Sequence, residues 1–240
     1  MHRALCEEYG TDVTDKGTPG AKSYYITHPA PLIRKAALLM RRTIVLLATM
    51  SLTLLVASGV ALAVTKIGTD GPDTLRGTNG DDILLGRGGN DTLLSLTGND
   101  DLLGGRGKDW VLGTNERRAL GGNKNLVGGS GNDGVEGGLG SDTLLGGSGN
   151  DFADGDRGSD NISGADGNDF LSNGGVLGGA KDTLSGGDGN NVIWTFNESS
   201  KRDVVTCGGG FDRVLADKAD MVAPDCERVA RGHAAVEQLN

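Results

Sequence analysis

A nine-residue repeat is the feature that most constrains the fold of this chain. The stretch GGSGNDGVEGGLGSDTLLGGSGND, residues 128–151, contains the same six letters twice, eighteen residues apart, with the variant GGLGSD midway between them. Ten clear copies share glycine at the fourth position and aspartate at the sixth, and nine of the ten have Leu, Val or Ile at the eighth. This period is typical of a solenoid, because each unit can bury its apolar face only against its neighbours. The copies begin at Gly68, Gly77, Gly86, Ser95, Gly104, Gly128, Gly137, Gly146, Gly155 and Gly164.

Each repeat combines a turn with a short strand. Glycine allows tight bends with positive φ that other residues rarely adopt. The segment that follows, such as DTLL, alternates between outward and inward positions, so only the eighth residue points inward. With 43 glycines and 4% aromatic residues in 240, the chain has a thin core. The repeats therefore need a further source of stability.

The charge distribution predicts that the repeats bind a cation. From residue 64 to the end there are 28 acidic and 16 basic residues, a balance that repels nucleic acid and attracts cations. An acidic disordered tail is an alternative, but the regular leucines argue against it. Carboxylate and carbonyl oxygens are the ligands that Ca²⁺ prefers, whereas zinc and copper favour His or Cys, which the repeats lack. The candidate ligands are Asp73, Asp82, Asp91, Asp100, Asp109, Asp133, Asp142, Asp151, Asp160, Asp169 and, after an insertion, Asp182.

The copies GGSGNDFAD and GGLGSDTLL resemble the hemolysin-type calcium-binding repeat of the RTX family, with pattern G-G-x-G-x-D-x-U-x. The resemblance covers residues 68–215 and implies an all-β, right-handed parallel β-roll (β-solenoid), with two nonapeptides per turn and Ca²⁺ between stacked turns. Sixth-position aspartates and turn carbonyls would hold the ions. The implied pairs are Asp73 with Asp91, Asp82 with Asp100, Asp91 with Asp109, Asp133 with Asp151, Asp142 with Asp160, and Asp151 with Asp169.

Two insertions depart from the pattern. Residues 113–127 place Arg118 and Lys124 near where aspartate is expected, so a side-chain cation there replaces the metal charge locally or caps one block. After the second insertion, at 173–176, Asp182 resumes the pattern, and the next copy has Asn191 in place of Asp. The repeat frame is therefore interrupted at both places.

The C-terminal part is expected to close the roll. The glycine pattern decays after residue 198, and residues 216–240 are predicted to form a cap and tail. Cys207 and Cys226 are the only cysteines after residue 63, and an exported protein usually pairs such a couple. A disulfide-linked cap is predicted, with two free thiols as the alternative.

The first 63 residues are interpreted as delivery segments. Residues 40–63 have two arginines, an apolar stretch and Ala61-Leu62-Ala63, as in a secretory signal peptide. Residues 1–39 are then an upstream extension before a translation start at Met40, and 64–215 form the repeat domain. Alternatively, residues 43–64 remain as a membrane anchor. Either way the repeats face the outside, and the resemblance implies secretion from a bacterium.

No catalytic pattern is present. The three histidines, at 2, 28 and 233, lie outside the repeats, and no nucleophile elbow, HExxH or phosphate-loop motif occurs. We therefore expect a calcium-binding structural or interaction module and no enzyme. The alternative is a calcium-independent β-solenoid adhesin or ice-binding protein, although the outward positions form no threonine ladder.

Leucines at outward ninth positions suggest a contact surface. Because successive copies alternate sides, they form a short apolar strip on each face, which could pair with another copy or a cell-surface partner. Alternatively, leucine is merely tolerated there, or another segment of the chain covers one strip. The residues are Leu85, Leu94, Leu103 and Leu112.

Overall fold

The computed structural model describes residues 62–113, 121–174, 180–195 and 201–232, together with two short strands near the N-terminus. Those strands, β1 (Val13–Asp15) and β2 (Tyr24–Ile26), pair antiparallel within the unit Met1–Val60. Apart from those two strands, residues 1–61 lie outside the described residues, and these include the predicted signal segment up to Ala61. Arg118 also lies outside them. The described part contains no helix that is long and apolar enough to span a membrane.

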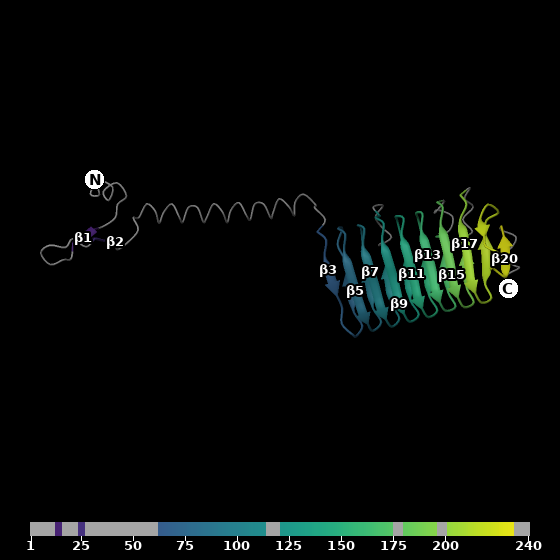
Figure 1. Cartoon of the computed structure of the whole chain (residues 1–240), viewed down its shortest axis with the longest axis horizontal. Helices are drawn as coiled ribbons and strands as arrows, with labels where there is room; N and C mark the ends of the chain where they lie inside the picture. The colour runs from purple at the N-terminus through teal and green to yellow at the C-terminus, as the bar shows by residue number, and fades with distance from the viewer. Residues whose placement is uncertain are drawn as a thin grey trace. The chain divides into compact units, whose positions relative to one another are not determined.

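The unit Ala61–Asn240 contains two parallel sheets of nine strands each. Consecutive strands alternate between the sheets, so each sheet receives every second strand, and Figure 1 shows them stacked in chain order. One sheet consists of β3 (Thr65–Ile67), β5 (Ile83–Gly88), β7 (Asp101–Arg106), β9 (Asn125–Ser130), β11 (Thr143–Ser148), β13 (Asn161–Asp166), β15 (Thr183–Asp188), β17 (Val204–Gly209) and β19 (Met221–Val222). The other consists of β4 (Thr74–Arg76), β6 (Thr92–Leu94), β8 (Trp110–Leu112), β10 (Gly134–Glu136), β12 (Phe152–Asp154), β14 (Phe170–Ser172), β16 (Val192–Trp194), β18 (Arg213–Ala216) and β20 (Arg228–Arg231). The predicted parallel β-solenoid is confirmed.

The eighth repeat positions form the core, as the alternation along each strand predicts. Their side chains are buried, whereas the seventh and ninth positions of the same strands are mostly exposed or half-buried. Each buried side chain stacks on its equivalent one turn later, because the strands pair in register. The core includes Leu84, Leu93, Leu102, Val111, Leu126, Val135, Leu144, Ala153, Ile162, Leu171, Leu184, Ile193, Val205 and Val214.

The strand register is the same on both sides of each insertion. Strand β9 pairs with β7 through Asn125 and Asp101, although these residues are 24 positions apart. Strand β15 likewise pairs with β13 through Thr183 and Asn161. The two blocks of repeats therefore form one continuous solenoid over the described residues.

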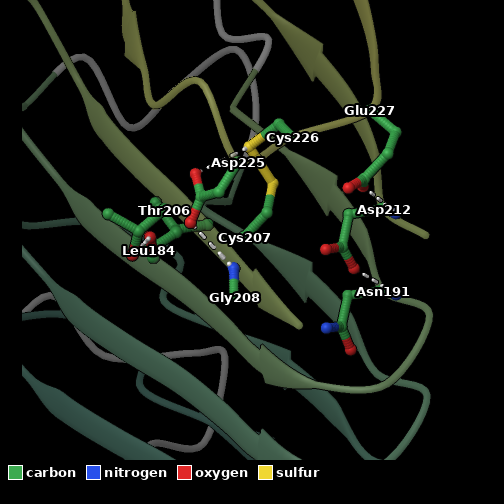
Figure 2. The surroundings of a disulfide bond; sticks show 9 residues. All are labelled: Leu184, Asn191, Thr206, Cys207, Gly208, Asp212, Asp225, Cys226 and Glu227. Carbon is green, nitrogen blue, oxygen red and sulfur yellow. Dashed lines mark hydrogen bonds between the residues drawn. A yellow bond between two sulfur atoms is a disulfide. The ribbon is translucent and has the colours of Figure 1, made fainter. Parts of the chain in front are cut away.

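The C-terminal strands extend both sheets and are joined by a disulfide. Strand β19 pairs with β17, and β20 pairs with β18. Cys207 of β17 and Cys226 are bonded, with their Cα atoms 5.2 Å apart, as Figure 2 shows. The predicted disulfide is confirmed. The two cysteines are 19 residues apart in sequence, and closing a loop of that length contributes roughly 3 kcal/mol to stability in the chain-entropy model.

The ninth-position leucines lie in register on the outer faces. Leu85 pairs with Leu103 in one sheet, and Leu94 pairs with Leu112 in the other, as expected from the alternation of copies. The first strip is longer than the sequence analysis predicted, because the same row continues with aliphatic residues on either side. Its full membership is Ile67, Leu85, Leu103, Val127 and Leu145.

Candidate metal site

The sixth-position side chains form two ladders along the turns of the solenoid. In each ladder, the backbone N–H of one residue donates to Oδ1 of the aspartate one turn later, as from Asp133 to Asp151 at 2.8 Å. Ladder 1 precedes the strands of the β4–β20 sheet and contains Asp73, Asp91, Asp109, Asp133, Asp151, Asp169, Asn191 and Asp212. Ladder 2 precedes the strands of the β3–β19 sheet and contains Asp82, Asp100, Lys124, Asp142, Asp160, Asp182, Asp203 and Asp220.

All six expected aspartate pairs are brought together. The structure also joins pairs that the nine-residue frame could not align, because the insertions shift the numbering. The N–H of Asp109 donates to Asp133 across the first insertion, and that of Asp160 donates to Asp182 across the second, both at 2.8 Å. Ladder 1 then ends with Asn191, Asp212 and Glu227 in sequence, as Figure 2 shows.

The second carboxylate oxygen of most ladder aspartates is buried and has no hydrogen-bond partner. Such an acceptor is costly inside a protein, because it has lost its water and gained no donor in return. Nine aspartates of the described residues share this property. They are Asp91, Asp100, Asp109, Asp133, Asp142, Asp151, Asp160, Asp169 and Asp212.

A backbone carbonyl faces the same space as six of these oxygens, those of Asp91, Asp109, Asp133, Asp142, Asp151 and Asp169. A Cβ built on Gly128 would lie 2.7 Å from Oδ2 of Asp133 and 2.6 Å from the carbonyl oxygen of Gly146. At Gly146 the corresponding distances are 2.5 Å to Oδ2 of Asp151 and 2.9 Å to the carbonyl oxygen of Gly164. The first repeat position is glycine because any side chain would fill the space between these two oxygens.

The second repeat position decides whether Oδ2 has a donor. In the first two repeats it is threonine, and the N–H of Thr69 donates to Asp73 Oδ2 at 2.6 Å, while that of Thr78 donates to Asp82 Oδ2 at 2.5 Å. In later repeats this position has positive φ even without glycine, as at Arg87 (82°). Such conformations cost on the order of 1–3 kcal/mol and occur where the surroundings impose them, often at functional sites. The other non-glycine examples are Leu96, Asp156 and Ala165.

Burial raises the pKa of the ladder carboxyl groups. Desolvation is the largest cause, and repulsion from neighbouring aspartates acts in the same direction. The pKa is raised to about 6 for Asp133, Asp142 and Asp151 and to about 7 for Asp160. A group buried in this way resists ionisation unless a positive charge is placed beside it. The ladders are therefore sites where a cation would offset a large electrostatic cost.

The donor atoms fit calcium. They are carboxylate and carbonyl oxygens, the ligands of hard dications, and Ca²⁺ accepts six to eight of them in irregular geometry. Within the described ranges, no three Asp, Glu, His or Cys side chains converge as a metal-binding group. Carbonyl oxygens of the turns would therefore have to complete the coordination, which suits Ca²⁺ better than a transition metal.

A second pair of ladders, formed by the fifth repeat position, was missed by the sequence analysis. Here the side chain accepts from the N–H one turn later, as when Asn150 donates to Asn132 Oδ1 at 2.9 Å and Asn168 donates to Asn150 Oδ1 at 2.8 Å. The direction is opposite to that of the aspartate ladders. The signal was available, because asparagine recurs at this position in Asn90, Asn99, Asn132, Asn150, Asn168 and Asn190.

Asn173 is a further ladder residue that sequence reasoning missed. Its Nδ2 donates to Oδ2 of Asp182 at 3.3 Å and to Oδ2 of Asp203 at 3.0 Å, which supplies both carboxylates with a donor. Asn173 occupies the place of a first-position glycine, directly after strand β14. It lies within an insertion, so no repeat pattern pointed to it.

Comparison with known families identifies the repeat. The family model described as RTX calcium-binding nonapeptide repeat (4 copies) matches residues 67–102, 95–115, 119–144, 136–171 and 177–197. These ranges include every ladder aspartate from Asp73 to Asp182. No curated protein matches the chain.

Proposed function

This chain belongs to the RTX calcium-binding nonapeptide repeat family, and on that premise we propose that it is an exported, non-catalytic protein whose solenoid is held together by calcium outside the cell. The observation that carries the proposal is the row of buried Oδ2 atoms without donors. Six of these Oδ2 atoms face the same space as a carbonyl oxygen of the next turn. Bound calcium supplies positive charge that links these oxygens from turn to turn.

The chain prepares the ligands before a cation arrives. Hydrogen bonds from backbone N–H groups to Oδ1 fix each carboxylate, as from Asp91 to Asp109 and from Asp151 to Asp169, both at 2.8 Å. Oδ2 is then left facing the glycine carbonyl. A carboxylate that is fixed in this way loses little further side-chain freedom on binding. Calcium affinity would therefore be coupled to the stacking of turns and rise cooperatively along the solenoid.

Export is supported by the sequence and by the needs of the site. Residues 40–63 have the arginines, apolar stretch and A-x-A ending of a signal peptide. Extracellular calcium modules bind at about 0.1–1 mM, a concentration of free calcium found outside cells. The extracellular role that we propose is structural or adhesive, since the repeats contain no histidine or nucleophile motif.

The test is a calcium titration of the full chain followed by far-UV circular dichroism. We expect strand signal to increase cooperatively with a midpoint of about 0.1–1 mM calcium and to fall on chelation to a smaller residual signal. The same spectrum and the same melting temperature in calcium and in chelator would contradict the proposal and favour a calcium-independent solenoid. Sequencing the N-terminus of the chain after expression in an exporting host tests cleavage after residue 63.

A further inference from the structure

Ladder 2 contains one basic residue at its centre. Lys124 directly precedes strand β9, and its N–H donates to Asp142 Oδ1 at 2.8 Å, as an aspartate at this position would. Its carbonyl oxygen accepts from the N–H of Thr143, and the carbonyl oxygen of Asp100 accepts from Asn125, both at 2.8 Å. Lys124 therefore occupies the position of a sixth-position aspartate, between Asp100 and Asp142.

The Lys124 side chain is directed into the protein. It is 1% exposed, and it is the largest fully buried side chain in the described part of the chain. Its Nζ donates to the carbonyl oxygen of Gly122 at 2.9 Å. Burial lowers the pKa of Lys124, while the charges of Asp142 and Asp100 act in the opposite direction. A buried ammonium group persists only where negative groups lie near it. The charges of Asp142 and Asp100 favour the ammonium form, although Oδ2 of neither accepts a hydrogen bond from it.

The turn before Lys124 also differs from its counterparts in ladder 1. Ser95 stands at a first repeat position, where ladder 1 has glycine at Gly86, Gly104 and Gly128. Its hydroxyl donates to the carbonyl oxygen of Gly113 at 2.7 Å. This carbonyl corresponds to those that face the carboxylates in ladder 1, so a protein hydroxyl already occupies one of the oxygens that a cation would use.

We propose that the Lys124 ammonium is a resident cation that takes the place of calcium between Asp100 and Asp142. This inference rests on the proposed calcium-binding function. The two intervals of ladder 2 on either side of Lys124 then hold no calcium, since a dication there would be repelled by the ammonium group at short range. The middle of ladder 2 stays ordered without metal, whereas ladder 1 in the same turns depends on it.

Hydrogen exchange on the full chain in chelator tests the inference without a mutation. The N–H groups of Lys124 and Asp133 occupy equivalent positions in neighbouring ladders. We expect slow exchange at Lys124 and fast exchange at Asp133 in chelator, and slow exchange at both in calcium. Equal exchange rates at the two positions in chelator would overturn the inference.

Two variants separate charge from shape. Lys124→Asp restores an aspartate at every position from Asp82 to Asp182 in ladder 2. This variant should bind about one to two more calcium ions per chain by equilibrium dialysis and should lose the slow hydrogen exchange at position 124 in chelator. Lys124→Met has similar length and no charge, so it should gain no calcium and lose the protection at position 124 in both conditions. If Lys124→Asp binds as many ions as a calcium-binding wild type, the lysine inference alone is wrong. If the wild type binds no calcium, the proposed function fails and the inference fails with it.

Discussion

The two ladders of one solenoid differ in how far the protein itself satisfies their polar groups. From Asp91 to Asp169, every inner aspartate of ladder 1 has an Oδ2 without a donor and a glycine at its first repeat position. Ladder 2 is mixed, because Oδ2 of Asp100, Asp142 and Asp160 also has no donor, whereas Asn173 and Thr195 donate to the carboxylates of Asp182, Asp203 and Asp220. Ser95 and Lys124 donate to turn carbonyl oxygens instead. A nine-residue frame can thus be completed by a bound cation or by a side chain, and the choice is made residue by residue.

The largest effect is expected from removing ligands at the centre of ladder 1. The double variant Asp133→Ala/Asp151→Ala removes two adjacent carboxylates that several intervals share, so calcium-induced folding should be lost at about 1 mM calcium. Circular dichroism during a calcium titration measures this. Asp154→Ala is the control, because Asp154 lies on the outer face of β12. Equal titration midpoints for the double variant and the control would show that the ladder aspartates are not ligands.

A smaller effect is expected in ladder 2, where a protein donor can be exchanged for a calcium requirement. Asn173→Gly leaves Asp182 and Asp203 without their amide donor, so the free energy of unfolding in chelator should fall by about 1–3 kcal/mol. Calcium should restore it, because the position now has the glycine of ladder 1. Urea unfolding with and without calcium measures both quantities.

The control for this variant is Asn161→Gly, at an exposed position of β13. It reports the general cost of replacing asparagine by glycine. If the two variants lose the same stability and calcium rescues neither, Asn173 does not substitute for a cation.

The calcium-free protein should be more stable at mildly acidic pH than at neutral pH. The pKa values of Asp133, Asp142 and Asp151 are raised to about 6, above the ordinary 3.8. The folded chain therefore holds more protons than the unfolded chain between about pH 4 and pH 6, and stability is lost as pH rises through that window. We expect more strand signal in chelator at about pH 5 than at about pH 7.

Calcium binding should show the opposite dependence, because protons compete for the same carboxylates. The titration midpoint should therefore rise as the pH falls from about 7 to about 5. Strand content in chelator that increases with pH would contradict the assignment of buried, proton-binding ladder carboxyls.

The smallest effect on stability is expected at the outer strips. The variant replaces Leu85, Leu94, Leu103 and Leu112 by serine. Leu103 is 41% exposed and the other three are half-buried, so little apolar area in the core is lost. Light scattering of the calcium-loaded chain and of this variant tests whether the strips pair two copies. If the unsubstituted chain stays monomeric at tens of micromolar, the strips do not pair two copies of the chain. A different partner is then the only remaining role for them as a contact surface.

The repeat frame predicted much of this arrangement, and its failures have physical causes. The inward eighth residues and all six aspartate pairs follow from a strict spacing, because stacked parallel strands bring residues one turn apart together. Asp109 and Asp133 were not paired in advance, since turns absorb extra residues without changing the register. Asn173 could not be found, because its role depends on two carboxylates that are 9 and 30 residues away.

Lys124 lies between these cases. The sequence shows Lys124 near the position where an aspartate is missing. The sequence alone does not decide whether the lysine replaces a metal charge or caps a block of repeats. The backbone hydrogen bonds settle its position, since they place it in register with Asp142, although a lysine side chain has no acceptor for the N–H of Asp100. Position in a repeat is readable from sequence, whereas the burial of one side chain within it is not.

The most direct test of the account is a crystal structure of the chain grown in calcium, with anomalous scattering to locate the ions. The account predicts a row of ions beside Oδ2 of Asp91, Asp109, Asp133, Asp151 and Asp169, and none beside Lys124. Ions distributed equally along both ladders, or no ions along ladder 1, would contradict it.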